Sequence, residues 1–301
     1  MDWQKACAKA GIKPVFGAEQ RWLEFNSDTS RENKTSGHDS SHIILLAEDQ
    51  RGLTNLWTLS SLAYEPENFY GKPQLNPTIM KAHAEGLWAS DGCGLTRFAG
   101  YAENDDAERC RMEWGILLDI FGDRFYSELH TFQIIDPGPD DLALNRKLTK
   151  MNLMKVKLAA EMGVPLVVVN DSHYSQQAQW EEHRLVYDLS TQAWKKDQVD
   201  TKGQAADWLM NEEEITYWLG KHGIRASVVS EAIANTRMIG ERCNVEIKPT
   251  LSMPRLYPTD AEDAKAFRRS IEEGFKRFVL DKGLPEKLYR DRLEYESSLI
   301  V

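Results

Sequence analysis

The sequence has 301 residues, 42% of them hydrophobic, which is enough chain to bury the core of one large or two ordinary domains. Its formal net charge of −10 argues against a protein that binds nucleic acid with its whole surface, because affinity for phosphates depends on clustered lysine and arginine. The four cysteines are widely spaced, which excludes a paired-cysteine zinc motif and a dense disulfide framework. The sequence shows no secretory signal and no apolar run of membrane-spanning length, so we expect a cytoplasmic protein with no membrane partner.

Five short apolar runs, bounded by Gly, Pro, Asn or Asp, have the length and composition of strands. They are residues 12–16, 43–47, 87–89, 125–129 and 165–169. Helix-length segments with apolar residues at spacings of three and four lie between them, at residues 53–63, 105–121 and 141–162. This alternation predicts βαβ units and an α/β fold with a mostly parallel sheet or barrel. Residues 26–41 contain no large apolar side chain, so a long surface loop is predicted there.

Helical patterns replace strand patterns after about residue 200. They cover residues 211–219, 228–243 and 261–280, and Asn211 is the predicted cap of the first. Three prolines then mark a domain boundary: Pro249, Pro254 and Pro258. We therefore expect one domain over residues 1–250, with its barrel body ending near residue 195, and a second region over residues 251–301.

Candidate metal ligands follow the strand-like runs, because the carboxyl ends of parallel strands gather functional groups. Glu19 follows the first run, Cys93 follows the third, and Asp171 and His173 follow the fifth. Carboxylate, thiolate and imidazole groups bind zinc or manganese, and Asp-x-His in an extended chain points both side chains to one face. Each candidate also has a structural alternative: a solvated charge for Glu19, a small buried residue for Cys93, and a helix cap for Asp171.

Three further residues lie within the strand-like runs. His42 opens the second run, so the strand-end argument does not place it with the other candidates, and a hydrogen-bonded core histidine is the default interpretation. Glu128 and His130 project to the same face of the fourth run, which makes them candidates to border the site and support its metal ligands.

Seven groups of segments, in order along nearly the whole chain, resemble the alpha subunit of bacterial DNA polymerase III, the family C replicative polymerase. They are residues 10–14 with 17–19, 42–47 with 52–56 and 59–61, 85–87 with 92–93, 121–129, 165–167 with 170–174, 233–236 with 241–245, and 292–296. The resemblance implies a polymerase-and-histidinol-phosphatase (PHP) domain, a distorted (β/α)₇ barrel with up to three metal ions at its carboxyl-end face. The family's metal-ligand positions fall on Glu19, His42, Cys93, Asp171 and His173, which favours a ligand role for His42. No catalytic residue is separable from these ligands.

The resemblance also implies a role in DNA replication, with zinc or manganese as cofactor. The implied partners are DNA and other replicase subunits, such as the sliding clamp or a proofreading exonuclease. The family's opening His-x-His strand and Asp-His-Gly motif do not occur in this sequence, so we expect a barrel that lacks its first strands and an incomplete metal shell. The aspartates for nucleotidyl transfer are expected beyond residue 301, with residues 251–301 forming a linker and the start of the polymerase palm.

Three functions remain open at this point. The first is a metal-dependent phosphoesterase with the 3′–5′ exonuclease activity that some family members carry. The second is a non-catalytic scaffold that stabilises the polymerase or docks a separate exonuclease. The third is a free-standing phosphatase. Competent residue types at all five ligand positions favour the first. Residues 292–296, which resemble the lead into the polymerase palm, argue against the third.

Overall fold

The structure is a computed structural model that describes residues 2–23, 40–69, 71–92, 94, 96–131, 141–191, 206–248 and 256–300. The chain divides into two compact units, Met1–Ile247 and Lys248–Val301. Within the described ranges, no helix has both the length and the apolar composition that crossing a bilayer requires.

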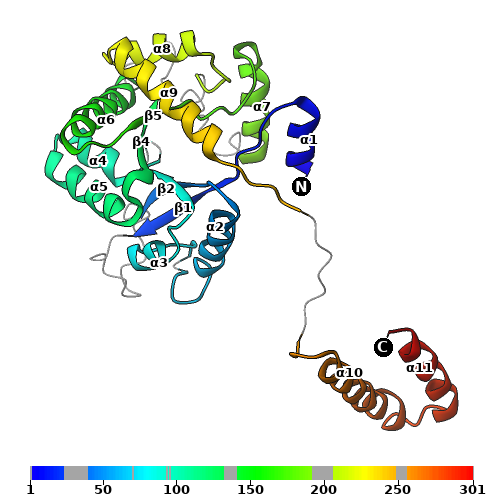
Figure 1. Ribbon diagram of the computed structural model, residues 1–301. Helices are drawn as coiled ribbons and strands as arrows, with labels where there is room; N and C mark the ends of the chain where they lie inside the picture. Colours follow the sequence, from blue (N-terminus) through cyan, green and yellow to red (C-terminus); the bar gives the residue numbers. More distant parts are fainter. Residues whose placement is uncertain are drawn as a thin grey trace. The chain divides into compact units, whose positions relative to one another are not determined.

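The first unit is a mixed α/β unit built on a five-stranded sheet, in which the strands lie side by side in chain order (Figure 1). The strands are β1 (Gly17–Leu23), β2 (Ser40–Ala47), β3 (Leu87–Ser90), β4 (Phe125–His130) and β5 (Leu166–Val169). Strand β2 runs antiparallel to both β1 and β3, whereas the β3–β4 and β4–β5 pairs are parallel. The predicted parallel arrangement therefore holds only for β3 to β5, because β2 is reversed relative to its neighbours.

The strand predicted at residues 12–16 is wrong. These residues form no strand, and β1 begins at Gly17. Pro14 has no N–H group to donate to a neighbouring strand, and Ile12 is 61% exposed, so burial does not stabilise an extended ladder there. The other four predicted runs overlap β2 to β5. Of the predicted loop, Ser40 and Ser41 belong to β2, and residues 26–39 lie outside the described part of the chain.

Helices surround the sheet of the first unit. They are α1 (Asp2–Ala10), α2 (Gln50–Leu62), α3 (Pro77–Ala82), α4 (Arg97–Glu103), α5 (Ala107–Phe121), α6 (Asp141–Met162), α7 (Trp180–Thr191), α8 (Glu212–Lys221) and α9 (Ala226–Arg242). The helices predicted around 53–63, 105–121 and 141–162 are α2, α5 and α6. Asn211 caps α8 in a reciprocal pair of hydrogen bonds with Glu214, as the sequence predicted.

The two faces of the sheet have different neighbours, because successive side chains of a strand point to opposite faces. Ile43 and Leu45 of β2 are fully buried in the main core, which also takes side chains from α2, α4, α5 and α6. Residues of the opposite face surround a pocket and a smaller apolar cluster, in which Trp88 and Tyr126 pack against Ile239 of α9. The sheet therefore separates a packed core from a partly open face.

Helix α9 covers the outer edge of β5. The Asn235 side-chain amide donates to the carbonyl of Leu166 at 2.9 Å, and the N–H of Val168 donates to Thr236 Oγ1 at 3.0 Å. An exposed strand edge is a site for unwanted pairing, and these two side chains satisfy part of it without another strand. Just past the end of α9, the N–H of Asn244 donates to the carbonyl of Glu48. The helix therefore links the edge strand β5 to the segment that follows β2.

The second unit consists of α10 (Asp260–Phe275), a π-helical turn (Lys276–Leu280) and α11 (Glu286–Ile300). Thr259 and Glu262 form a capping box at the start of α10. Among the described residues, the buried apolar side chains of the second unit are Phe275 and Val279. The Arg290 guanidinium lies 3.8 Å from the centre of the Phe275 ring. This small core holds the two helices together as a hairpin.

Replacing Thr236 with valine tests the edge contact of β5. The change removes the acceptor of the Val168 N–H while keeping the side-chain shape, so we expect a loss of about 1 kcal/mol in the free energy of unfolding, measured by urea denaturation. The control is Thr58→Val in α2. Both hydroxyls donate to the carbonyl four residues earlier, but among the described residues a strand N–H donates only to Thr236 and not to the half-buried Thr58. Equal losses in the two variants would contradict the edge role.

Candidate functional site

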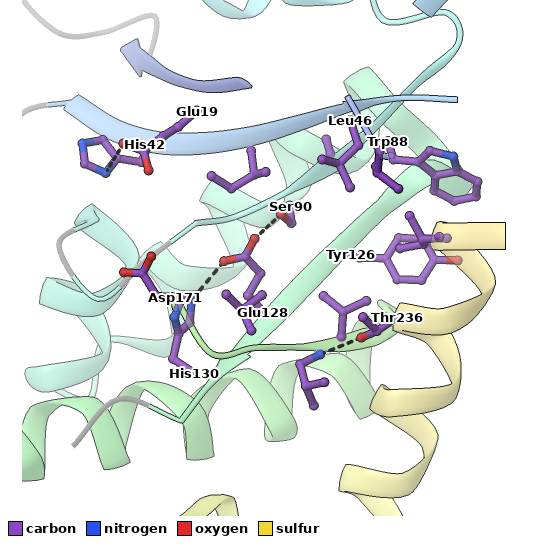
Figure 2. Close-up of a pocket in the computed structure, with 18 residues that line it drawn as sticks. Glu19, His42, Leu46, Trp88, Ser90, Tyr126, Glu128, His130, Asp171 and Thr236 are labelled. Carbon is purple, nitrogen blue, oxygen red and sulfur yellow. Dashed lines mark hydrogen bonds and ion pairs between the residues drawn. The ribbon is translucent and has the colours of Figure 1, made fainter. Parts of the chain in front are cut away.

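A pocket of about 510 Å³ opens on the face of the sheet that does not pack on the main core. Its polar side chains gather at one end, where Glu19, His42, Glu128, His130 and Asp171 lie, and Trp88 and Tyr126 lie at the other (Figure 2). All five strands contribute to the lining, and α9 contributes Thr236, Ile239 and Gly240. The pocket is therefore an apolar cavity with a polar, carboxylate-rich end.

His42 and Glu19 form a pair at the polar end. Glu19 lies opposite Ile44, two residues from His42, so the two side chains are diagonal neighbours on one face, with His42 Nδ1 3.3 Å from Glu19 Oε1. Burial lowers the pKa of His42, and the Glu19 charge opposes that shift. Because β2 runs opposite to β3, its beginning lies at the edge where β3 ends. Glu19 lies inside β1, and its predicted place after a strand at residues 12–16 is wrong.

Glu128 and His130 form a second pair, on β4. His130 Nε2 lies 2.9 Å from Glu128 Oε2 and 3.1 Å from the carbonyl of Gly92, and the Ser90 hydroxyl donates to Glu128. Both partners of Nε2 are acceptors, so this nitrogen carries a proton. Burial alone would raise the pKa of Glu128, but the hydrogen bond and charge of His130 and the charge of Lys155 outweigh it and hold the pKa below its usual value.

Asp171 and His173 do not share the pocket. Asp171 lines it, whereas His173 is not among the lining residues, and its Nδ1 lies 2.7 Å from the backbone carbonyl of Asp171 and 3.4 Å from Asp207 Oδ2. Asp171 has a φ of 51°, in the left-handed region. The prediction of an extended Asp-x-His with both side chains on one face is therefore wrong, because the chain turns at Asp171. Their ligand roles stay predictions.

Asp207 had no place in the sequence prediction. Its side chain is buried and faces His173, and burial together with the Asp171 charge raises the pKa of Asp207 to about 8. Cys93 lies outside the described residues, so its ligand role also stays a prediction.

Metal binding requires more donors than the described residues bring together. Structural zinc sites have four protein ligands and catalytic sites usually three. Among the residues that the structure describes, no group of three or more His, Cys, Asp or Glu side chains is placed to hold one ion. The donor types suit zinc or manganese, but the described donors alone do not fit a bound metal.

Two polar residues of α6 that the sequence prediction missed support the site. Asn152 is fully buried; its side chain accepts from the N–H of His130 at 3.2 Å, donates to its carbonyl at 2.8 Å, and lies 2.7 Å from His222 Nδ1. Lys155 is fully buried and pairs with Asp91. Both lie on the apolar stripe of α6, with Leu148 and Leu158, so polar residues at stripe positions were the available signal.

Comparison with known proteins agrees with this architecture. Residues 1–132 match the PHP domain family. The chain is 27% identical to the DNA polymerase III subunit alpha of Treponema pallidum over 100% of its length, 30% identical to that of Borreliella burgdorferi over 99%, and 28% identical to that of Aquifex aeolicus over 98%. It covers 24%, 24% and 25% of these relatives, so it spans about a quarter of their length.

The first unit thus carries a PHP domain within a mixed α/β fold. The chain as a whole is a homologue of part of the DNA polymerase III alpha subunit.

His222 predicts a pH dependence of stability. Burial, with a smaller effect of the His130 charge, lowers the pKa of His222 from its ordinary 6.5 to about 4. Between these values the unfolded chain takes up a proton that the folded protein does not. The contribution of His222 to stability is therefore complete above pH 6.5 and falls as the pH drops towards 4, by on the order of 3 kcal/mol.

Urea unfolding between pH 4 and pH 8 measures this effect. His222→Gln keeps an acceptor for Asn152 but has no proton to gain, so its stability is expected to decline less on acidification. His83→Gln, at the end of α3 and outside this network, serves as control. Parallel pH profiles for wild type and His222→Gln would contradict the prediction.

Proposed function

We propose that this chain is part of a DNA polymerase III alpha subunit and contributes its PHP domain to DNA replication. The similarity to alpha subunits over 98–100% of the chain supports this proposal. Its partners are then DNA and the other subunits of the replicase, such as the sliding clamp or a proofreading exonuclease. The polymerase reaction itself belongs to the whole subunit.

The pocket is, in this proposal, a metal-dependent phosphoesterase site of the 3′–5′ exonuclease type. The observation that carries it is the convergence of Glu19 and His42, from the antiparallel pair β1 and β2, with Asp171 after β5, around one pocket. Carboxylate and imidazole groups are ligands of zinc and manganese. Cys93 and His173 are the further ligands in this proposal, and His173 would have to turn from Asp207 towards the pocket to take that role. The PHP barrel is the architecture that would bring these donors together.

A non-catalytic scaffold is the second candidate, and one observation favours it. Glu128 and His130 are engaged with each other and with Ser90 and Gly92, as a closed set of hydrogen bonds in the interior. Such a set stabilises β4 against the turn after β3 without any ion. A PHP domain of this kind would support the polymerase body or bind a separate exonuclease.

Metal content and nuclease activity separate the two candidates. We expect the full-length protein encoded by the gene, purified without chelator, to retain zinc or manganese by elemental analysis and to shorten 5′-labelled single-stranded DNA from its 3′ end. His42→Ala and Asp171→Ala should each reduce both by at least about tenfold, the loss that even outer-shell changes cause at metal sites.

The matched control is His83→Ala, because His83 is a half-buried histidine outside the pocket. Metal content and DNA shortening should remain at the wild-type level in this variant. A wild-type protein that carries no metal and leaves the labelled strand intact would leave the scaffold function as the conclusion.

A further inference from the structure

Lys155 lies fully buried on α6, next to the turn that follows β3. Its Nζ lies 3.0 Å from Asp91 Oδ1, 3.0 Å from the carbonyl oxygen of Glu128 and 3.4 Å from that of Gly92. An ammonium group has three N–H donors, and here each has its own acceptor. The lysine therefore joins α6, β4 and the turn after β3 at one point.

Both carboxylate oxygens of Asp91 also have hydrogen-bond partners. Its Oδ1 accepts from Lys155 and from the N–H of Glu128 at 3.0 Å, and its Oδ2 accepts from Trp114 Nε1 at 3.0 Å and the Ser127 hydroxyl at 2.9 Å. A buried ion pair offsets its desolvation only when the remaining hydrogen-bonding capacity is also used, and this pair meets that condition. The turn at Asp91 and Gly92 is thereby fixed to three neighbouring elements.

Gly92 transmits this constraint to the pocket. It has a φ of +69°, and a Cβ added to it would lie 2.9 Å from the carbonyl oxygen of His42 and 3.3 Å from His42 Cβ. The Gly92 backbone therefore lies directly against His42. On its other side, the Gly92 carbonyl is held by His130 Nε2 at 3.1 Å and by Lys155. A shift of Gly92 would displace the histidine at the polar end of the pocket.

We propose that Lys155 is a positioning residue of the pocket, whose ammonium holds Gly92 against β2 and so fixes the place of His42. Lys155 does not line the pocket, so its role is exerted through Gly92. The proposal depends on the proposed function only for the activity of the pocket. The position of His42 can be measured in the absence of metal and DNA. Loss of nuclease activity and loss of positioning are therefore separate results.

The test is heteronuclear NMR of the full 301-residue chain. Lys155→Met alone leaves the Asp91 charge buried without its counter-ion, so it is paired with Asp91→Asn, which removes that charge and keeps the shape of residue 91 and one of its two acceptor oxygens. We expect the double variant to fold, with the imidazole resonances of His42 and His130 and the amide resonance of Gly92 shifted from wild type.

The matched control is Leu158→Ala, a fully buried change on the same helix that leaves the Lys155 contacts in place. It should lower the thermal midpoint without moving the three reporter resonances comparably. Unmoved reporters in a folded double variant, or equal shifts in the control, would overturn the proposal.

Wild-type protein provides a second measurement that decides the question even where the double variant does not fold. The Lys155 ammonium protons should exchange slowly with water and show nuclear Overhauser contacts to the Phe98 ring, since Nζ lies 5.6 Å from its centre. Fast exchange, or no contact to Phe98, would show that the ammonium is not held at the turn and would reject the positioning role.

Discussion

The ion pair between Lys155 and Asp91 is the contact on which the geometry of the pocket depends. A charged ammonium group in a protein interior is tolerated only with a counter-ion and with acceptors for every N–H, because desolvation costs several kcal/mol or more. The turn after β3 supplies two of the three acceptors, and β4 supplies the third. Other arrangements of this turn would leave a buried charge unmatched, which makes this arrangement the favoured one. The start of β2 and the end of β4 are positioned against it.

The reversed direction of β2 explains how residues from different parts of their strands reach one end of the pocket. In a fully parallel sheet, a histidine that opens a strand lies at the edge opposite to the residues that close the other strands. Here Ile44 lies opposite Ser90, so the register continues to place His42 beside Gly92, at the end of β3. Glu19 reaches the same place from within β1, through its diagonal contact with His42.

The sequence was sufficient to predict the elements whose periodicity follows from burial. Strands β2 to β5 and helices α2, α5 and α6 all overlap predicted segments, because a strand or helix with one buried face must repeat its apolar residues at a fixed spacing. The first strand was misplaced, because residues 12–16 are apolar in composition but have no partner strand. Strand direction was not predictable either, since it depends on pairing between distant segments.

For the site, the sequence predicted the residue types but not the contacts between them. Glu19, His42, Glu128, His130 and Asp171 do line one pocket, whereas His173 turns instead towards Asp207. The backbone conformation of Asp171 determines this difference: aspartate adopts the left-handed region more often than most residues, but the sequence Asp-Ser-His does not specify it at this position. Asn152 and Lys155 were detectable in principle, because a polar residue on the apolar stripe of a helix needs a buried partner.

The charge balance of the pocket bears on which role it performs. Glu19 and Glu128 each have a histidine within hydrogen-bonding or ion-pair distance, so neither depends on a metal ion for a partner. Asp171 differs from them, because no cationic side chain pairs with it among the residues that the structure describes, and its charge contributes to raising the pKa of the neighbouring Asp207. A divalent cation beside Asp171 would offset that repulsion, whereas one beside Glu128 would have to displace His130 and Ser90. If the pocket holds a metal ion, electrostatics therefore favour a position beside Asp171 over one at the buried pair on β4.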